Sequence, residues 1–290
     1  MNILNKTFSL NNGQFIFQHN FTPRPVKSEF NLHIHKCYEL YYFISGNVPF
    51  YIEGQQYAVQ SGDFLIINSK ELHRACIAEE QPYERIVMFC KPEYVNFLNT
   101  ASYNLFDCFE RRKLGYFNIT ERSKVLKYQI DKQIIAIEEQ FKTGAIDSEI
   151  MIFSIFVQLL VKLNQIYLHE NALQVYSQGR DTSKTQAILN YINDNLSTKI
   201  TLDLLQQEFY ISKYYLCRIF KQSTGFGVYE YITYKRLLRA KELLCEGISA
   251  SEVAHHVGFE NYSNFYRLFK KVYGFSPKKI KDEQHEDWRI

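Results

Sequence analysis

A short helical unit occurs twice near the C-terminal end of this 290-residue chain, and this repeat constrains the fold more than any other feature. The copies read TLDLLQQEFYISKYYLCRIFKQSTGF and SASEVAHHVGFENYSNFYRLFKKVYGF, and they align on residues 218–221 and 267–270. The offset is about 49 residues, a period typical of a duplicated supersecondary unit. Residues 201–280 are therefore expected to contain two copies of one small helical structure.

Each copy is predicted to form a helix, a tight turn and a second helix. In the second copy, Gly258 can adopt the positive φ that ends a helix, and Asn261 is a good N-cap for the next one. The apolar residues of that next helix are spaced by three and four positions, so they define one buried face: Phe265, Leu268, Phe269 and Val272. The first copy follows the same scheme with Ser212 as the N-cap. The opposite faces carry polar, arginine and lysine residues, which suit a major groove.

Residues 228–246, between the two copies, are predicted to form one helix. Nineteen residues at about 1.5 Å each give a rod of roughly 28 Å, and one turn of B-DNA measures about 34 Å. A connector of this length would place the two polar helices in successive major grooves on one side of a duplex. The sequence thus favours a monomer that reads two grooves.

Residues 199–280 resemble the AraC/XylS family of bacterial transcription regulators. The matching stretches are ISKYYLCRIFKQSTGF, YKRLLRAKELL and SEVAHHVGFENYSNFYRLFKKVYGFSPKKI. The resemblance implies a C-terminal all-α domain with two helix-turn-helix motifs that binds double-stranded DNA. By position in these motifs, it implies base contacts from Tyr214, Cys217, Arg218, Ser263, Asn264 and Arg267. We expect phosphate contacts from the lysines around them, namely Lys213, Lys221 and Lys270.

The first copy departs from the family pattern at its turn. Gln206 stands where the family usually has alanine, and Tyr210 stands where it usually has glycine. Tyrosine at positive φ is costly, so the sequence predicts a less regular first turn.

Charge and cysteine usage agree with a DNA-binding part joined to a neutral part. The net charge is only +3, but residues 213–281 contain 13 Lys or Arg and 5 Asp or Glu.

The six cysteines are scattered without a C-x-x-C pair, which is typical of a reduced, cytoplasmic protein. The first residues carry no secretion signal pattern, and the apolar run 150–163 is too short to span a bilayer. We therefore expect a cytoplasmic protein with no membrane partner.

The first ninety residues are rich in short β-strand patterns separated by glycine turns. The predicted strands cover 15–19, 38–45, 49–52, 56–59, 64–68, 75–78 and 85–90. Many short strands with such turns indicate a sandwich or a small barrel, and the high aromatic density suits an apolar interior or ligand pocket.

Residues 24–90 contain His33-x-His35-x-x-x-Glu39 followed by Gly46, and then Gly62-Asp63 followed by His73, and these resemble the two cupin motifs. The second motif is incomplete. The resemblance implies a cupin-like β-barrel, the kind of sensor domain often joined to AraC-type DNA-binding domains, with a small effector such as a sugar. His33, His35, Glu39 and His73 are then effector-binding residues. The alternatives are a divalent metal at the same four residues, because imidazoles and a carboxylate suit transition metals, or purely structural roles, in which His33 and His35 sit in the pocket or bond backbone groups and Glu39 pairs with an arginine.

Residues 91–183 are predicted to be a helical connector. From Ser123, apolar residues recur at helical spacing: Leu126, Ile130, Ile134, Ile137 and Phe141. A second helix starts near Ser148, with an inward face formed by Ile150, Phe153, Val157, Leu160 and Leu163. These stripes pack on the barrel, form a homodimer interface, or do both. The predicted division is 1–170 for the effector domain with its connector, 171–183 for a linker and 184–290 for the DNA-binding domain.

The predicted function is that of a sequence-specific transcription regulator, of the activator class, and not of an enzyme. It is expected to be controlled by a small-molecule effector and to need no cofactor. Two alternatives stay open. A metal-dependent cupin enzyme would hold a stoichiometric metal, and an architectural DNA-binding protein would bind DNA without responding to any small molecule.

Overall fold

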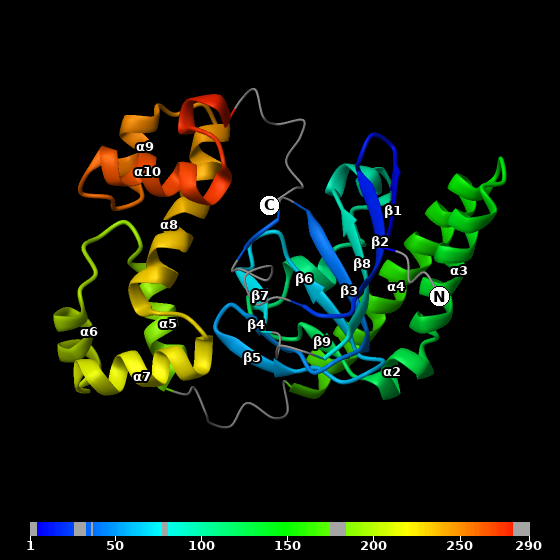
Figure 1. Ribbon diagram of the computed structural model, residues 1–290, viewed down its shortest axis with the longest axis horizontal. Coiled ribbons are helices and arrows are strands. Elements are labelled where there is room, and N and C mark those ends of the chain that lie inside the picture. The colour runs from blue at the N-terminus through cyan, green and yellow to red at the C-terminus, as the bar shows by residue number, and fades with distance from the viewer. Residues whose placement is uncertain (1–4, 26–32, 36, 77–80, 175–183, 281–290) are drawn as a thin grey trace. The chain divides into compact units, whose positions relative to one another are not determined.

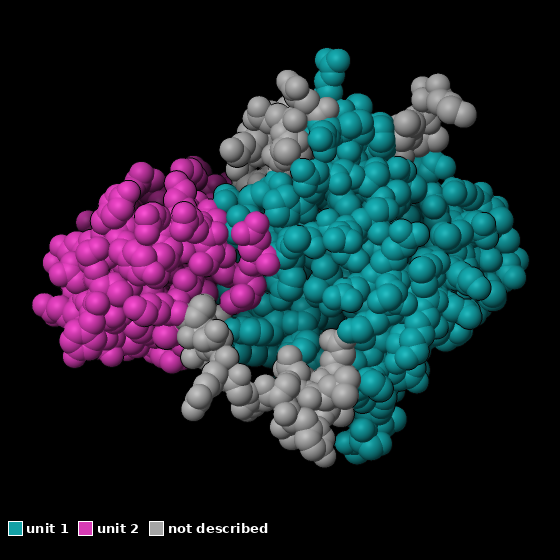
Figure 2. Space-filling view, turned by 90° about the horizontal axis from the view of Figure 1, so that it is seen from below, with its two compact units in different colours: residues 1–53, 57–179 teal, residues 54–56, 180–290 magenta. Residues whose placement is uncertain are grey.

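The computed structural model describes residues 5–25, 33–35, 37–76, 81–174 and 184–280. The chain divides into two compact units (Figures 1 and 2). Unit 1 comprises residues 1–53 and 57–179, and unit 2 comprises residues 54–56 and 180–290. The predicted combination of a β-rich N-terminal part with flanking helices and an all-helical C-terminal part is confirmed.

Unit 1 is built on two antiparallel sheets. The larger sheet has the strand order β1-β2-β8-β3-β6-β9, and the smaller has the order β5-β4-β7. The strands are β1 (Lys6–Leu10), β2 (Phe15–Thr22), β3 (Tyr38–Ser45), β4 (Pro49–Ile52), β5 (Gln55–Ala58), β6 (Phe64–Ile67), β7 (His73–Ala75), β8 (Tyr83–Cys90) and β9 (Ile119–Thr120).

The central strands of the larger sheet are buried on both faces, which explains their nearly continuous apolar sequences. In β3, Tyr38 and Leu40 point to one face and pack with the helices, whereas Tyr41 and Phe43 point to the other face and pack with the smaller sheet. Glu39 follows the second set, so its carboxylate is directed to the same side as Tyr41. A charged side chain on this face needs polar partners.

The predicted strands mostly lie within a residue or two of the observed ones. The prediction of a strand at 75–78 is wrong in its bounds, because β7 starts at His73 and residues 77–80 lie outside the described part. This shift places His73 in the smaller sheet, where β7 pairs with β4. β1 and β9 were not predicted, since their alternation of apolar and polar residues is short.

Helices cover one face of the larger sheet (Figure 1). They are α1 (Asp107–Glu110), α2 (Arg122–Lys127), α3 (Ile130–Thr143) and α4 (Ser148–Gln174), preceded by 3-10 turns at Pro92–Tyr94 and Asn96–Leu98. The single helix predicted from Ser123 to Phe141 is wrong, because Gln129 adopts a left-handed conformation at φ 56° and separates α2 from α3. Leu126 is consequently not on the buried apolar face that continues through α3, and its side chain is 51% exposed.

The inward face of α4 differs from the predicted one at its start. Ile152, Phe156, Leu159, Leu160 and Leu163 are buried in the core, whereas Ile150 is 73% exposed. The helix also runs on to Gln174, so the first residues of the predicted linker are helical, and residues 175–183 lie outside the described part. Its segment Ser148–His169 is long and apolar enough to cross a membrane, but its inner face belongs to the core of unit 1.

Unit 2 consists of two helix-turn-helix units joined by a long helix. Its helices are α5 (Lys184–Asp194), α6 (Leu202–Phe209), α7 (Lys213–Thr224), α8 (Val228–Cys245), α9 (Ala250–His256) and α10 (Tyr262–Tyr273). Figure 1 shows α8 running between α5–α7 at one end and α9–α10 at the other. Eighteen residues give α8 a length of about 27 Å, close to the predicted rod.

Helix α8 is buried at both ends by different partners, which is why it has no single apolar stripe. Near its start, Tyr231 packs edge-on against Phe220 of α7 at 5.7 Å between ring centroids. Near its end, Leu237 and Leu244 belong to a core with Val253 of α9 and Phe265 of α10. Each helix-turn-helix unit therefore rests on its own half of the connector.

The two turns reach the same geometry with different residues. Gly258 has φ +89°, and a Cβ there would come 2.6 Å from the backbone oxygen of Leu196, so glycine is required. Tyr210 adopts φ 52° in the equivalent turn, and its side chain is 93% exposed. The expectation of a less regular first turn is wrong, because an exposed tyrosine meets no clash and the strain is confined to its own backbone.

Candidate nucleic-acid interface and effector site

Helix α7 presents a polar face at the start of the first repeat. The Ser212 side chain accepts a hydrogen bond from the backbone N–H of Tyr215 at 3.2 Å, which fixes the start of the helix as predicted. Leu216 and Phe220 are fully buried. Tyr214 on the opposite side is 77% exposed, so the first turn of α7 is available to a partner.

Helix α10 repeats this construction. Its N-cap is Asn261, whose side chain accepts from the backbone N–H of Asn264 at 3.1 Å. Phe265 and Phe269 are fully buried, whereas Ser263, Asn264 and Arg267 are exposed. The polar face is again the face opposite the core, as the sequence predicts.

The two arginines at equivalent positions are each held by the side chain one helical turn earlier. The Arg218 guanidinium lies over the ring of Tyr215 at 5.5 Å from its centroid. The Arg267 Nη2 donates a hydrogen bond to the Asn264 Oδ1 at 3.0 Å. Both side chains stay exposed, so an oriented guanidinium with free N–H donors is offered by each repeat.

The other predicted DNA contacts differ in how available they are. Lys221 and Lys270 are exposed in the last turns of their helices, and Cys217 is half-buried beside Arg218. Lys213 forms an ion pair with Asp203 of α6, which the sequence analysis did not predict. The predicted residues thus gather on two helices at opposite ends of α8 (Figure 1).

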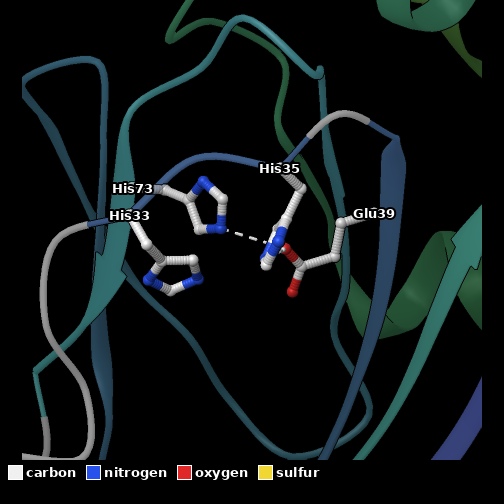
Figure 3. Close-up of side chains that lie close together, drawn as sticks. All are labelled: His33, His35, Glu39 and His73. Atoms are coloured by element: carbon white, nitrogen blue, oxygen red, sulfur yellow. Dashed lines mark ion pairs between the residues drawn. The ribbon is translucent and has the colours of Figure 1, made fainter. Parts of the chain in front are cut away.

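A second group of polar side chains lies inside unit 1, where the structure brings together all four residues predicted from the cupin-like motifs (Figure 3). His33 and His35 precede β3, Glu39 belongs to β3 and His73 belongs to β7. One ligand atom from each lies within 4.8 Å of those of the others. The backbones of His33 and His73 also pair, with two N–H to oxygen bonds of 3.1 Å.

Glu39 is the only carboxylate of this four-residue cluster and lies between two imidazoles. Its Oε2 is 2.9 Å from the Nε2 of His73 and 3.2 Å from the Nε2 of His35. Burial opposes its ionisation, but His73 and His35 hold the pKa of Glu39 well below its usual value. For His73, burial favours the neutral ring, yet the adjacent Glu39 raises its pKa above the usual value. The cluster thus combines a buried carboxylate and a buried imidazole, Glu39 and His73, with two partly buried imidazoles from the segment before β3.

Residues that the sequence analysis missed fix the orientation of His73. Its Nδ1 lies 2.8 Å from the backbone oxygen of Glu71, to which it donates a hydrogen bond. The Glu71 carboxylate is fully buried and accepts from Arg112, from the backbone N–H of Gly115 and from the side chain of Asn118. Arg112 lies in a stretch without periodicity, so no local signal identifies it.

Comparisons with known proteins agree with both parts of this description. Residues 22–110 match the model of the AraC-like ligand binding domain, and residues 205–283 match a helix-turn-helix domain model. The first match contains the four-residue cluster, and the second contains α7 and α10. A unit of the ligand-binding class followed by two helix-turn-helix motifs defines a DNA-binding transcription regulator.

Among similar proteins, the HTH-type transcriptional activator RhaS of Escherichia coli O157:H7 is 23% identical over 266 residues, which cover 89% of this chain and 90% of RhaS. Fatty acid-bound ToxT from Vibrio cholerae covers 93% of this chain and 95% of ToxT, with 13% identity and a TM-score of 0.37. The C-terminal domain of the response regulator yesN from Fusobacterium nucleatum is 33% identical over 33% of this chain and 95% of that domain, with a TM-score of 0.32. The chain belongs to the AraC/XylS family of transcription regulators.

Proposed function

We propose that this protein is a sequence-specific activator of transcription that binds DNA through α7 and α10 and is controlled by a small molecule bound in unit 1. The observation that carries the proposal is the repeated arrangement of Arg218 and Arg267. Each is exposed on the polar face of a second helix-turn-helix helix and each is oriented by the residue three positions earlier. A guanidinium held in this way can donate two hydrogen bonds to the O6 and N7 atoms of guanine.

The roles of the remaining residues follow from their positions. Tyr214 and Ser263 occupy the same place in the two repeats, one position before the residue that holds the arginine, and both are exposed. They are suited to contact base edges, together with Cys217 and Asn264. Lys221 and Lys270 lie one turn further along and are suited to contact phosphates. Lys213 is paired with Asp203. A phosphate contact by Lys213 would be weaker than one by Lys221 or Lys270, because this ion pair must first open.

The experiment that tests DNA recognition is selection of duplexes from a random pool by the purified full chain, followed by band-shift titration. We expect a site with two short conserved segments whose centres lie about 10 base pairs apart, because each recognition helix enters one of two successive major grooves. Binding should weaken steeply with added salt. Affinity that does not differ between selected and random duplexes would contradict a sequence-specific regulator.

The effector is proposed to bind beside the His33, His35, Glu39 and His73 cluster, where Glu39 supplies a buried carboxylate on the same face of β3 as the apolar Tyr41 and Phe43. A sugar is the class of effector that the resemblance to cupin-like sensor domains implies, and Glu39 and His73 would bind its hydroxyl groups. A thermal-shift screen of sugars on the full chain tests this, since a ligand that binds only the folded state raises the melting temperature. We propose that the role of the protein is regulatory rather than enzymatic. Regulation of transcription in a bacterium would take place in the cytoplasm.

A homodimer is proposed to form through the exposed side of α4. Ile146, just before the helix, Ile150 and Leu168 lie on one side at helical spacing, and they are 103%, 73% and 51% exposed. Between them, Val157 and Val161 are only partly buried. Two such stripes from two copies of the chain can cover each other across a two-fold axis.

Ile150→Glu should therefore weaken self-association by at least about 30-fold, because an unpaired carboxylate would be buried between the two helices. Analytical ultracentrifugation of the full chain over a range of concentrations measures this change. Gln158→Glu adds the same charge at an exposed position of α4 away from the stripe and serves as the matched control. Equal effects of the two variants would place the interface elsewhere.

A further inference from the structure

An arginine side chain in the middle of α8 contacts both halves of unit 2. Arg236 is half-buried, and its Nε donates a hydrogen bond to the backbone oxygen of Leu196 at 2.9 Å. Its Nη2 donates another to the backbone oxygen of Thr198 at 2.6 Å. The same guanidinium lies over the ring of Phe259, with Cζ 5.9 Å from the ring centroid. Arg236 therefore touches the segment after α5 and the turn before α10 at the same time.

The two carbonyl oxygens bound by this guanidinium belong to the half of unit 2 that contains α7. They follow α5, which is fixed on both helices of the first helix-turn-helix. Tyr191 of α5 packs edge-on against Phe209 of α6 at 5.7 Å between ring centroids. The hydroxyl of Thr185 at the start of α5 lies 3.2 Å from the hydroxyl of Ser223 in α7. A change in the position of α7 would therefore carry these two oxygens with it.

The turn on the other side of the guanidinium holds the start of α10. Phe259 is 6% exposed, and its ring packs against the buried Phe265 of α10 at 5.3 Å between centroids. A Cβ at Gly258 would come 2.9 Å from the Cζ of Arg236 and 2.6 Å from the backbone oxygen of Leu196. The arginine, the segment after α5 and the turn are thus in close contact, and a displacement of α10 would have to disturb them.

A second link between the same two segments lies at the surface. Lys199 Nζ and Glu260 Oε1 are 2.8 Å apart, but the side chains are 73% and 72% exposed. An ion pair this exposed is screened by salt and contributes little rigidity. The partly buried, three-way contact of Arg236 is the stronger connection of the two.

We infer that Arg236 is a positioning residue that sets the distance and angle between α7 and α10, and thereby the spacing of the two DNA segments that the protein recognises. The inference rests on the proposed function. One base pair inserted between the segments moves the second by about 3.4 Å along the duplex and by about 35° around it. Two helices held rigidly cannot follow such a change, whereas two helices released from each other can adjust to it.

The test compares the selected site with duplexes in which one base pair is inserted or deleted between the two segments, in band-shift titrations of the purified full chain. The wild-type chain should prefer the selected spacing by at least about 10-fold, because a misplaced helix loses an arginine contact worth roughly 5- to 150-fold. In Arg236→Ala the preference for spacing should fall below about 3-fold, since both helices can then keep their arginine contacts. The base preference within each segment should stay as in the wild type.

Two variants separate the position of the guanidinium from its charge. Arg239→Ala removes the same charge from an exposed site on α8, where Arg239 pairs with Glu242 at 2.7 Å, and it should keep the wild-type preference for spacing. Arg236→Lys keeps the charge but lacks the fork of donors that reaches both carbonyl oxygens, so it should relax the preference as alanine does. Circular dichroism verifies that each variant folds, and the lysine variant carries the test if the alanine variant does not fold.

A second measurement needs no DNA. Tyr214 of α7 and Tyr266 of α10 are exposed, and p-acetylphenylalanine in place of both accepts spin labels without using the cysteines. Pulsed dipolar electron paramagnetic resonance of the full chain then gives the distribution of distances between the two helices. The distribution should be narrow in the wild-type and Arg239→Ala backgrounds and clearly broader in Arg236→Ala.

A folded Arg236 variant that keeps the wild-type preference for spacing, or the wild-type width of the distance distribution, overturns the inference. A wild-type chain that recognises its two segments equally well at every spacing also overturns it. A wild-type chain that binds no duplex specifically overturns the proposed function instead, and the distance distribution alone then decides whether Arg236 positions the two helices.

Discussion

Replacing Arg112 with methionine is expected to lower the free energy of unfolding of unit 1 by about 3–5 kcal/mol, because it leaves the Glu71 carboxylate buried without its cationic partner. Both side chains of this pair are 0% exposed, and Arg112 Nη1 donates to Glu71 Oε1 at 2.6 Å. The hydrogen bonds from Gly115 and Asn118 remain in the variant, but they do not neutralise the charge. Methionine fills much of the same volume, so the loss reports mainly on the charge.

Hydrogen exchange of the full chain, read peptide by peptide, measures this effect within unit 1. Peptides from β6 and β8 should exchange faster in Arg112→Met, whereas peptides from α8 provide an internal reference. Arg111→Met is the matched control, because Arg111 is the neighbouring residue, is 70% exposed and pairs with Asp107 at the surface. It should change stability by less than about 1 kcal/mol. If both variants lowered the free energy of unfolding by similar amounts, the buried Arg112–Glu71 pair would contribute no more to stability than an exposed ion pair.

Replacing Arg267 with alanine is expected to weaken binding to the selected DNA site by about 1–3 kcal/mol, which is roughly 5- to 150-fold, and to relax the base preference at one position. The structure gives the reason, since Asn264 holds the guanidinium on the exposed face of α10. Band-shift titration against the selected site and its single-base variants measures both changes.

Two further variants distinguish base reading from charge at this position. Arg267→Lys keeps the charge but loses the planar fork of donors, so it should lose base preference nearly as fully as alanine does. Lys270→Ala, in the last turn of the same helix, should weaken binding to all duplexes alike. It should also reduce the slope of log affinity against log salt concentration by about one, because one phosphate contact fewer releases about one counterion fewer. Unchanged affinity and unchanged preference in Arg267→Ala would show that α10 does not read bases with this residue.

The features predicted well from the sequence are those that local rules determine. The caps Ser212 and Asn261 and the buried faces of α7 and α10 follow from side-chain type and helical spacing, and the structure confirms them. The four-residue cluster was predicted from motif spacing and is brought together as expected. Its roles in binding an effector or a metal stay predictions, as do the DNA contacts and the bounds of the linker.

The features that escaped prediction depend on contacts between distant residues. Glu71 and Arg112 lie 41 positions apart in sequence, and neither belongs to a pattern that would announce a buried ion pair. The break between α2 and α3 occurs at Gln129, without a glycine or proline to signal it. The inward face of α4 is set by packing on the sheet, which exposes Ile150 although helical spacing alone would bury it.

If Arg218 and Arg267 read bases as proposed, their different neighbours give a bound monomer a direction along the duplex. Arg218 can keep its stacking contact with the ring of Tyr215 while the edge of its guanidinium meets a base. Arg267 must share or surrender its hydrogen bond to the Asn264 amide, whose released oxygen and NH₂ group are then free to read an adjacent base themselves. In the proposed complex, one half of the recognised sequence would therefore be read by a preset guanidinium and the other by an exchangeable arginine–asparagine pair, so reversing the two halves would create a different target.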